Sequence, residues 1–524
     1  MKSKTDSRLS FPFILSTMET WFVVVVSLCV AALIRSLLFH RRNGKKLPPG
    51  PSFISSNFSL LTRSRLEFET TLINLKSRYG SLITLYIGSR PSIFVGSHSL
   101  AHQVLIQKGA VFSDRPKSFA MMNISSASYG PTWRLFRRNL ASEILHPAHI
   151  KSYSWARKWV LHILIGRLQE QKEVVGIQVV DHFQYAMFCL LVLMCFGEKL
   201  DENQINEIAR VQRDMLLRIG SGRFTVLTML PRLGKILFRN RWKEFEQLRE
   251  DKEHVLIPFI KSRIEANKSE SQFRDEQIVA YVDTLVNLQL PEEEGNNENG
   301  GKLTHKEMVS MCSEFLNAGT DTTSTALQWI MANLVKYPHI QSKLYDEIIS
   351  VVGPPPPPPR PGVEPESVIN EEELKKMPYL KAVVLEALRR HPPAHFVLPH
   401  RVTKEVEVLG FTIPEGASIN FMVAEMGLDP KVWEDPMVFK PERFINGDFD
   451  ITGSKGIKMM PFGAGRRICP GFDLALLHLE YFVANLIWYF HWSPPDGYHV
   501  DLSEKLEFTV VMKNPLRTQI SSRV

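Results

Sequence analysis

Cysteine is scarce in this chain of 524 residues, which has only Cys29, Cys189, Cys195, Cys312 and Cys469. An odd and scattered set is a poor disulfide framework and lacks the short spacings of a zinc site. The chain also has no evident internal repeat, and its net charge of +8 is modest for its length. These features favour a globular protein in a reducing compartment and argue against a nucleic-acid-binding role.

Charge is absent from the apolar run at residues 21–34, which resumes after Arg35 and ends at Phe39. As a helix, residues 21–39 would span about 28 Å, close to the hydrocarbon thickness of a bilayer. The basic cluster at 40–46 would hold the rest of the chain on the cytosolic side. No small-residue cleavage site follows, so a retained single-pass anchor is favoured over a signal peptide or a buried core helix. Elsewhere charged residues interrupt the apolar runs, and no second span is predicted.

A proline-rich hinge separates this anchor from the body of the chain. Residues 1–17 are a possible upstream extension, because their basic side chains weaken the orientation signal and Met18 would be a better start. Residues 18–46 form the anchor with its basic flank, and residues 47–51 form a stiff hinge that cannot continue a helix. No later linker divides the chain, so residues 52–524 are predicted to form one domain.

The body reads as mainly α with small β-sheets. Residues 82–95 contain two apolar runs around a glycine-containing turn, which predicts a β-hairpin. A capping-box spacing opens a predicted helix at 304–335, about 45 Å long. A second helix is predicted at 378–390, short strands and turns at 392–471, and a final helix after Gly471.

Cys469 differs from the other four cysteines, which lie in apolar or helix-like stretches. It occupies a loop, residues 462–471, that contains three glycines and ends where a helix begins. A helix N-terminus and neighbouring arginines favour a thiolate, and an iron centre would favour it more. Gly465 can take the positive φ of a tight turn, and Gly471 lets the helix backbone approach a flat ligand. An ordinary buried cysteine is the plain alternative; a dinucleotide-binding loop fails because Ile468 stands where the third glycine is needed.

The order F-x-x-G-x-R-x-C-x-G in this loop resembles the haem-binding loop of the cytochrome P450 family, and all its fixed positions match. The resemblance implies a single P450-type haem domain, preceded by the N-terminal transmembrane helix. It implies haem b as the cofactor and Cys469 as the axial iron ligand. Arg467 would pair with a haem propionate, and Phe462 would pack beside the thiolate.

Further segments match the family's pattern in the same order along the chain. Trp133 and Arg137 fit its W-x-x-x-R and are implied propionate contacts, as is His400, which lies where family members often place another such partner. A metal site made of His391, His395 and His400 is a weaker reading, since two prolines prevent the first two from sharing a helix face.

The family's E-x-x-R and P-E-R-F elements are matched by Glu386, Arg389 and Arg443. Alone, each motif would more often be a solvated salt bridge, but together they resemble the buried ionic network that supports the haem loop. The sequence Ala-Gly-Thr-Asp-Thr-Thr in the long helix resembles the family's oxygen-activation segment. It implies Asp321 and Thr322 as the proton-delivery pair, and its small residues would let the helix pass close over a haem face.

The resemblance is strongest to the plant microsomal A-type group and implies a monooxygenase acting on a small apolar or amphipathic metabolite. A thiolate favours O–O cleavage at haem iron. The chain has no nucleotide-binding loop, so electrons from NADPH should come through a separate flavoprotein reductase in the endoplasmic reticulum membrane, where lipid holds the anchor. A haem-thiolate isomerase or dehydratase that needs no oxygen and a non-catalytic haem sensor are alternatives, and the Asp321–Thr322 pair favours monooxygenation.

Substrate identity is not encoded in any motif. The segments 121–128, 315–323, 395–398 and 506–509 resemble pocket-lining segments and suggest a largely apolar cavity. Lipids, terpenoids, phenolics and tetrapyrrole-derived compounds all remain open. One departure from the family's pattern, at residues 425–430, leaves the local packing there in question.

Overall fold

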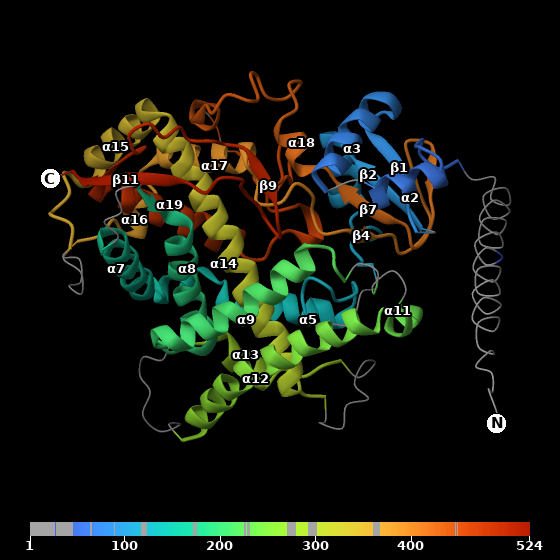
Figure 1. Cartoon of the computed structure of the whole chain (residues 1–524), viewed down its shortest axis with the longest axis horizontal. Coiled ribbons are helices and arrows are strands. Elements are labelled where there is room, and N and C mark those ends of the chain that lie inside the picture. Colours follow the sequence, from blue (N-terminus) through green and yellow to red (C-terminus); the bar gives the residue numbers. More distant parts are fainter. Residues whose placement is uncertain are drawn as a thin grey trace, which may run out of the picture.

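The computed structural model describes residues 46–523 and the single residue Ser27, with gaps at 63–64, 89, 117–122, 171–175, 225–226, 228–230, 270–278, 292–300, 360–366, 446 and 448. The predicted anchor at 21–39 and the extension at 1–17 therefore lie outside the described residues, apart from Ser27. The body is mainly helical, and its largest sheet lies toward one end of the molecule (Figure 1). This agrees with the fold class that the sequence predicts.

The predicted long helix is α14 (His305–Lys336), which runs through the centre of the molecule (Figure 1). Thr304 caps it as expected: its hydroxyl accepts from the amide of Glu307, whose carboxylate accepts from the amide of Thr304 at 2.8 Å. At 32 residues the helix is about 48 Å long. Nearly all its side chains from Thr323 to Val335 are buried, so its second half is the spine of the larger core.

Beside α14 packs α8 (Val179–Phe196), which is almost entirely apolar and ends at Gly197 in a left-handed conformation. Among the described residues, α8 is the one helix long and apolar enough to cross a membrane by length and composition. This run was not predicted as a possible span, although Asp181 is its one acidic residue. Since 72% of the run is buried inside the protein, its apolar character is explained by a core position.

The predicted hairpin is confirmed as β1 (Leu82–Ile87) and β2 (Arg90–Val95), paired antiparallel with Leu82 opposite Val95. β2 also pairs in parallel with β7 (Ser418–Phe421), and β7 pairs with β4 (His400–Arg401), giving the order β1-β2-β7-β4. A smaller apolar core lies on this sheet. The sheet therefore brings His400 next to segments from the first fifth of the chain.

A second sheet, β3-β11-β8, joins residues 177–178 to the last strand of the chain. Two hairpins, β5–β6 and β9–β10, complete the strands. The strands not yet bounded are β3 (Ile177–Gln178), β5 (Val406–Val408), β6 (Phe411–Ile413), β8 (Phe490–Ser493), β9 (Glu504–Leu506), β10 (Val510–Met512) and β11 (Arg517–Ser522).

Other helices surround α8 and α14 and cover the sheets. Those that match predicted elements are α17 (Pro378–Arg390), as expected at 378–390, and α19 (Phe472–Tyr489), which begins directly after Gly471. The remaining helices are α2 (Phe53–Thr62), α3 (Arg65–Tyr79), α4 (His98–His102), α5 (Pro131–Asn139), α6 (Pro147–Ser152), α7 (Ser154–Glu170), α9 (Glu202–Gly220), α11 (Pro231–Leu237), α12 (Arg239–Ser269), α13 (Tyr281–Val286), α15 (Pro338–Val352), α16 (Glu371–Leu374) and α18 (Val423–Gly427), with short π-helical turns at Gln103–Gln107 and Leu140–Ile144 and 3-10 turns at Pro441–Phe444 and Gly465–Arg467.

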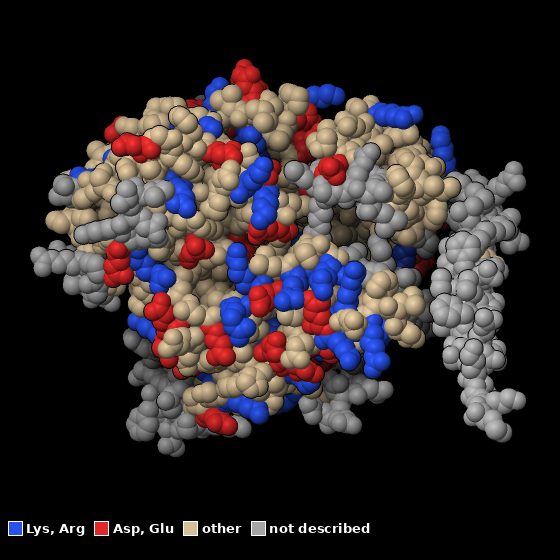
Figure 2. Space-filling model, viewed as in Figure 1, with Lys and Arg blue, Asp and Glu red and all other residues tan. Residues whose placement is uncertain are grey.

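Acidic and basic side chains are interspersed over the face shown in Figure 2.

Candidate active site

The Cys469 loop, residues 462–471, is held in a tight turn by two glycines in the left-handed region. Gly463 has φ 72° and Gly465 has φ 71°, so the positive φ expected at Gly465 is confirmed. A Cβ at Gly465 would also lie 2.2 Å from the carbonyl oxygen of Leu105, in the π-helical turn that packs on the loop. The amide of Cys469 donates to the carbonyl of Phe462 at 2.9 Å, which closes the loop.

Phe462 and Gly471 lie on either side of the cysteine in the chain. The Phe462 ring lies 6.2 Å from the ring of Phe472, the first residue of α19. A Cβ at Gly471 would meet no atom of the described residues within 4 Å, so protein packing does not by itself require glycine there.

Opposing effects act on the Cys469 thiol. Burial raises its pKa above the usual range, while the backbone N–H of Gly471 and the charge of Arg137 lower it. The helix start that the sequence pointed to is thus present, but the arginine that lowers the pKa is Arg137 and not the neighbouring Arg466 or Arg467, and burial outweighs both effects. Because a metal-bound thiol is deprotonated outright, a cation bound at the sulfur would stabilise the thiolate that the loop alone does not.

Two of the predicted propionate contacts, Arg137 and Trp133, lie beside the Cys469 loop, and a third, Arg467, belongs to it. Arg137 donates from Nη1 to the carbonyl of Ile468 at 2.5 Å. Arg467 stacks over the Trp133 ring, with its guanidinium carbon 4.4 Å from the centroid. The guanidinium of Arg467 also donates to three carbonyls, of Ser113, Ile124 and Ala127, at 2.7–3.0 Å.

His400 lies near the same cations. It is buried on β4, and its Nδ1 donates to the carbonyl of Phe112 at 2.6 Å. Burial and the charges of Arg115 and Arg467 lower the pKa of His400 to about 3, so the ring is neutral at physiological pH. His400 does not share a partner with His391 and His395, which both contact Glu504. Among the described residues no group of three or more His, Cys, Asp or Glu could hold a metal ion, so the weaker reading of a site made of these three histidines is not supported.

Arg115 belongs to this group and was missed by sequence reasoning. It is buried, and it donates to the carbonyls of Ser125, Leu398 and Pro399 at 2.7–3.0 Å. Burial and the nearby charge of Arg467 lower the pKa of Arg115 to about 9. No local spacing links Arg115 to the Cys469 loop, because the two meet only through tertiary contacts.

This donor set fits a flat, doubly negative group beside Cys469. Burial lowers the pKa of Arg467 to about 10. The charge of Arg137 adds to this effect, and the charge of Asp114 partly opposes it. The cations therefore repel one another in a partly desolvated place, where a dianion would stabilise them. The indole N–H of Trp133 is buried and has no hydrogen-bond partner among the described residues, which leaves a donor for the same group.

The acid-threonine segment of α14 has the local geometry that the sequence predicts. Thr322 donates from Oγ1 to the carbonyl of Ala318 at 2.6 Å, the expected back-bond within the helix. The Asp321 carboxylate lies 3.4 Å from Nε2 of Gln184 on α8 and 3.4 Å from Nη1 of Arg213 on α9. Burial raises the pKa of Asp321, and Glu507 adds to this while Arg213 opposes it.

One prediction about α14 needs correction. Gly319 was expected to bring the helix close to a haem face, but a Cβ there would lie 2.6 Å from Cδ1 of Leu191, so this glycine serves the packing of α14 on α8. Ala318 is instead exposed and is the small residue that can border a ligand.

A loop at residues 123–127 ties α14 to the Cys469 loop. Glu314 of α14 accepts from the amides of Ile124 and Ser125 at 2.8 and 2.7 Å. On its other side this loop gives the carbonyls of Ile124 and Ala127 to Arg467. Asp321 and Thr322 thereby lie about two helical turns from Glu314, whose contact with this loop leads to the cysteine-bearing loop.

The predicted ionic network is present and buried. Arg389 donates to both carboxylate oxygens of Glu386 at 2.7 and 2.8 Å, and neither side chain is exposed. Nε of Arg443 lies 3.4 Å from Oε1 of Glu386. Arg389 also donates to the carbonyls of Gly427 and Pro436 at 2.6 and 2.9 Å.

The departure at residues 425–430 has a local explanation. A Cβ at Gly427 would lie 2.5 Å from the carbonyl oxygen of Arg389, so α18 can approach α17 this closely only at glycine. Glu425 of the same helix accepts from Nζ of Lys76 at 2.8 Å. The unusual residues are therefore packed and paired.

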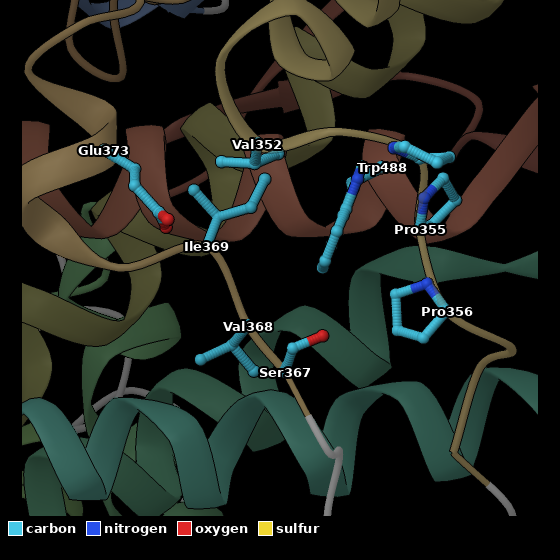
Figure 3. A pocket seen from close by; sticks show the side chains of 9 residues that line it. Val352, Pro355, Pro356, Ser367, Val368, Ile369, Glu373 and Trp488 are labelled. Atoms are coloured by element: carbon cyan, nitrogen blue, oxygen red, sulfur yellow. The ribbon is translucent and has the colours of Figure 1, made fainter.

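A cleft of about 350 Å³ lies elsewhere, between the proline-rich segment after α15 and α19 (Figure 3). Trp488 lines it and donates from Nε1 to the carbonyl of Gly353 at 2.9 Å. Trp488 is about 25 Å along α19 from Gly471, and no residue of the predicted site lines the cleft.

Comparison with known proteins agrees with this fold and site. The sequence profile of the cytochrome P450 family matches residues 48–521. The chain is 47% identical to cytochrome P450 89A9 of Arabidopsis thaliana over 96% of this chain and 98% of that protein. It is 28% identical to flavonoid 3'-monooxygenase of Arabidopsis thaliana, over 92% of each chain. A zebra fish cytochrome P450 solved with abiraterone has the same fold, with a TM-score of 0.68 at 22% identity, over 87% of this chain and 100% of that one.

The fold and the cysteine-bearing loop define a haem-dependent oxidoreductase. The chain belongs to the cytochrome P450 family, is a monooxygenase of that family with plant relatives, and has haem b as its cofactor.

Proposed function

We propose that this enzyme inserts one atom of molecular oxygen into a small apolar or amphipathic metabolite at a haem held by Cys469. Electrons come from NADPH through a separate flavoprotein reductase, since the chain has no nucleotide-binding loop of its own. The observation that carries the proposal is the 123–127 loop, which Glu314 of α14 and Arg467 of the Cys469 loop hold from opposite sides. It joins the proton-bearing segment to the candidate iron ligand.

Haem b supplies the redox centre at which oxygen is activated and a C–H bond is attacked. The chain's own residues would hold that group and deliver protons. Arg115, Arg137, Arg467 and the Trp133 N–H form the cationic side that receives its carboxylates. Thr322 holds a hydroxyl proton on α14, and the neighbouring Asp321 lies 3.4 Å from Arg213, whose side chain is 44% exposed. Asp321 thus connects the interior to solvent as a proton carrier.

Thr322→Val is expected to uncouple turnover: NADPH and oxygen are consumed, but product per NADPH falls by about tenfold and peroxide rises, because proton delivery at the hydroxyl is lost. Thr320→Val is the matched control, since Thr320 makes the same type of back-bond, to Leu316 at 2.8 Å, but is buried. NADPH oxidation, oxygen uptake and product are measured together. An unchanged coupling ratio in Thr322→Val would contradict the proposal, and turnover without NADPH or oxygen would favour an isomerase or dehydratase.

The substrate is expected to be apolar over most of its surface. Leu398 and Phe508, in two of the predicted pocket-lining segments, expose 52% and 40% of their surface. A relative at 28% identity is named for action on flavonoids, which are aromatic metabolites of this general character.

We also propose that the body rests on the endoplasmic reticulum membrane beside the N-terminal anchor, with its catalytic side in the cytosol. The helices α2 and α11 lie at the same end of the molecule (Figure 1). Each exposes large apolar side chains: Ile54 and Phe58 on α2 at 62% and 66%, and Ile236 and Leu237 on α11 at 76% and 66%. Exposed apolar side chains gathered at one end suit a lipid surface.

In a chain that begins at residue 46, replacing Ile236 and Leu237 by serine is expected to weaken binding to phosphatidylcholine vesicles by about tenfold, through lost apolar burial. Met437→Ser with Val438→Ser is the control, since these side chains are 61% and 53% exposed at a different place in the fold. Vesicle flotation gives the bound fraction. Equal loss in both double variants, or in neither, would contradict the proposed orientation.

A further inference from the structure

Two histidines and two glutamates form a largely buried group outside the chemistry described above. His395 lies 2.6 Å from Glu69 through Nδ1 and 3.2 Å from Glu504 through Nε2. Glu504 also accepts from Nδ1 of His391 at 3.0 Å. The side chains of His395, Glu69 and Glu504 are only 10%, 14% and 23% exposed. The group joins α3 near the start of the chain to β9 near its end.

The geometry fixes which histidine is charged. Both ring nitrogens of His395 face carboxylate oxygens, which only accept, so the ring carries two protons and a positive charge. Burial opposes this charge, but the hydrogen bonds to Glu504 and Glu69 raise the pKa of His395 to about 9. His391 is different: burial lowers its pKa to about 4, and its ring stacks on Trp329 with the planes at 1° and the centroids 4.0 Å apart. His395 is therefore the cation that holds two carboxylates together.

Glu504 is the first residue of the β9–β10 hairpin, and the far end of this hairpin reaches the active-site helix. Thr509 Oγ1 lies 3.0 Å from Thr325 Oγ1, one turn beyond Thr322 on α14. Phe508 packs so closely on the end of α9 that a Cβ at Gly220 would lie 3.1 Å from its Cα. Burial and, to a smaller extent, the charge of Glu507 at the hairpin tip raise the pKa of Asp321.

His395 is also the start of a segment that runs toward the Cys469 loop. Two residues on, Cγ1 of Val397 lies 3.6 Å from the position a Cβ would take on Gly463. The same histidine thus fixes the segment bordering the cysteine and, through Glu504, the hairpin bordering α14. Both segments are among those that line the expected substrate chamber.

We propose that His395 is a positioning residue for the substrate chamber: by bridging Glu69 and Glu504 it holds the β9–β10 hairpin against α3 and so determines which bulky ligands fit beside the haem. The inference rests on the proposed function and deepens it, because it assigns the chamber's selectivity for large ligands to a charged bridge outside the chamber's own apolar lining. Neutral, shorter side chains at this position would release the hairpin without touching the iron ligand or the cationic group.

Two azoles of different size test this in the full-length holoenzyme. Imidazole reaches only the iron and its immediate surroundings, whereas clotrimazole, which carries three aryl rings, also contacts the chamber walls. His395→Asn and Glu504→Gln are each expected to change the clotrimazole Kd, read from the shift of the haem absorption band, by about fivefold or more while the imidazole Kd stays within about twofold. In the same variants the amide of Val510, which donates to Pro393 at 2.9 Å, should exchange its hydrogen faster.

His98→Asn is the matched control, since His98 is also partly buried beside an acid, with Nδ1 3.7 Å from Asp429, and does not contact the hairpin. A change in clotrimazole Kd of less than about twofold in Glu504→Gln, or an equal change in the His98 variant, would overturn the inference alone. If His395→Asn fails to hold haem, Glu504→Gln and the exchange rate of Val510 decide. A wild-type protein that binds neither azole would overturn the proposed function and this inference with it.

Discussion

Cys469→Ala is expected to abolish the absorption band that reduced, thiolate-ligated haem shows with carbon monoxide, and with it all product formation. Alanine leaves the loop's backbone bonds intact, including the 2.9 Å bond between the Cys469 amide and Phe462, but removes the one atom that can donate a thiolate. Difference spectra of the reduced protein with and without carbon monoxide make the measurement, and bound haem is quantified on the same sample.

Cys195→Ala is the control for this experiment. Cys195 is fully buried in α8, where burial keeps the pKa of its thiol well above the usual range, so it serves as a small apolar side chain. Its loss should cost stability of about 1 kcal/mol and leave the carbon monoxide spectrum unchanged. A thiolate-type spectrum that persists in Cys469→Ala would refute the assignment of the ligand.

Glu386→Gln is expected to lower the free energy of unfolding by about 3–5 kcal/mol, because it leaves Arg389 and Arg443 charged and without their shared counterion. Arg389 cannot regain water, since its side chain is fully buried between α17 and the carbonyls of Gly427 and Pro436. Urea unfolding followed by circular dichroism gives the midpoint and slope. Haem content should fall in parallel, as the network lies beside the segment that leads into the Cys469 loop.

Glu442→Gln is the control, because it removes the charge of an exposed ion pair instead of a buried one. Glu442 pairs with Lys343 at 2.7 Å, but the two side chains are 41% and 53% exposed. Loss of that pair should cost no more than about 1 kcal/mol. Equal destabilisation by the two glutamine variants would show that the buried network has no special weight in the fold.

Local patterns predicted those parts of the molecule whose partners are near in sequence or whose motif is long. The Thr304 cap, the 82–95 hairpin and the Glu386–Arg389 pair each depend on residues a few positions apart, and all three are present. The ten residues of the Cys469 loop predicted its turn, because Gly465 permits a backbone conformation that few other residues adopt.

Tertiary contacts account for what the sequence did not predict. Arg115 joins the cationic group through carbonyls of residues about 280 positions away, and no spacing encodes such a meeting. Gly319 is small enough to border a ligand, yet Leu191 of α8 packs against it. His395 was considered for metal binding, but its two glutamate partners come from opposite ends of the chain. Only Gly319 lies in an element that the sequence predicted, and for all three residues the partners of the side chain are set by tertiary packing.

The pairing of the last strand has a consequence for how the protein is made. β11 (Arg517–Ser522) completes its sheet against β3 at residues 177–178. The partners of the Cys469 loop, Trp133 and Arg137, likewise come from the first third of the chain. During synthesis on the ribosome, helices α5 to α17 emerge before the Cys469 loop and β11 have been made. Cofactor capture and closure of the sheet therefore follow the synthesis of most of the helices, and a chain that stops before residue 469 would hold those helices but neither the candidate iron ligand nor the closing strand.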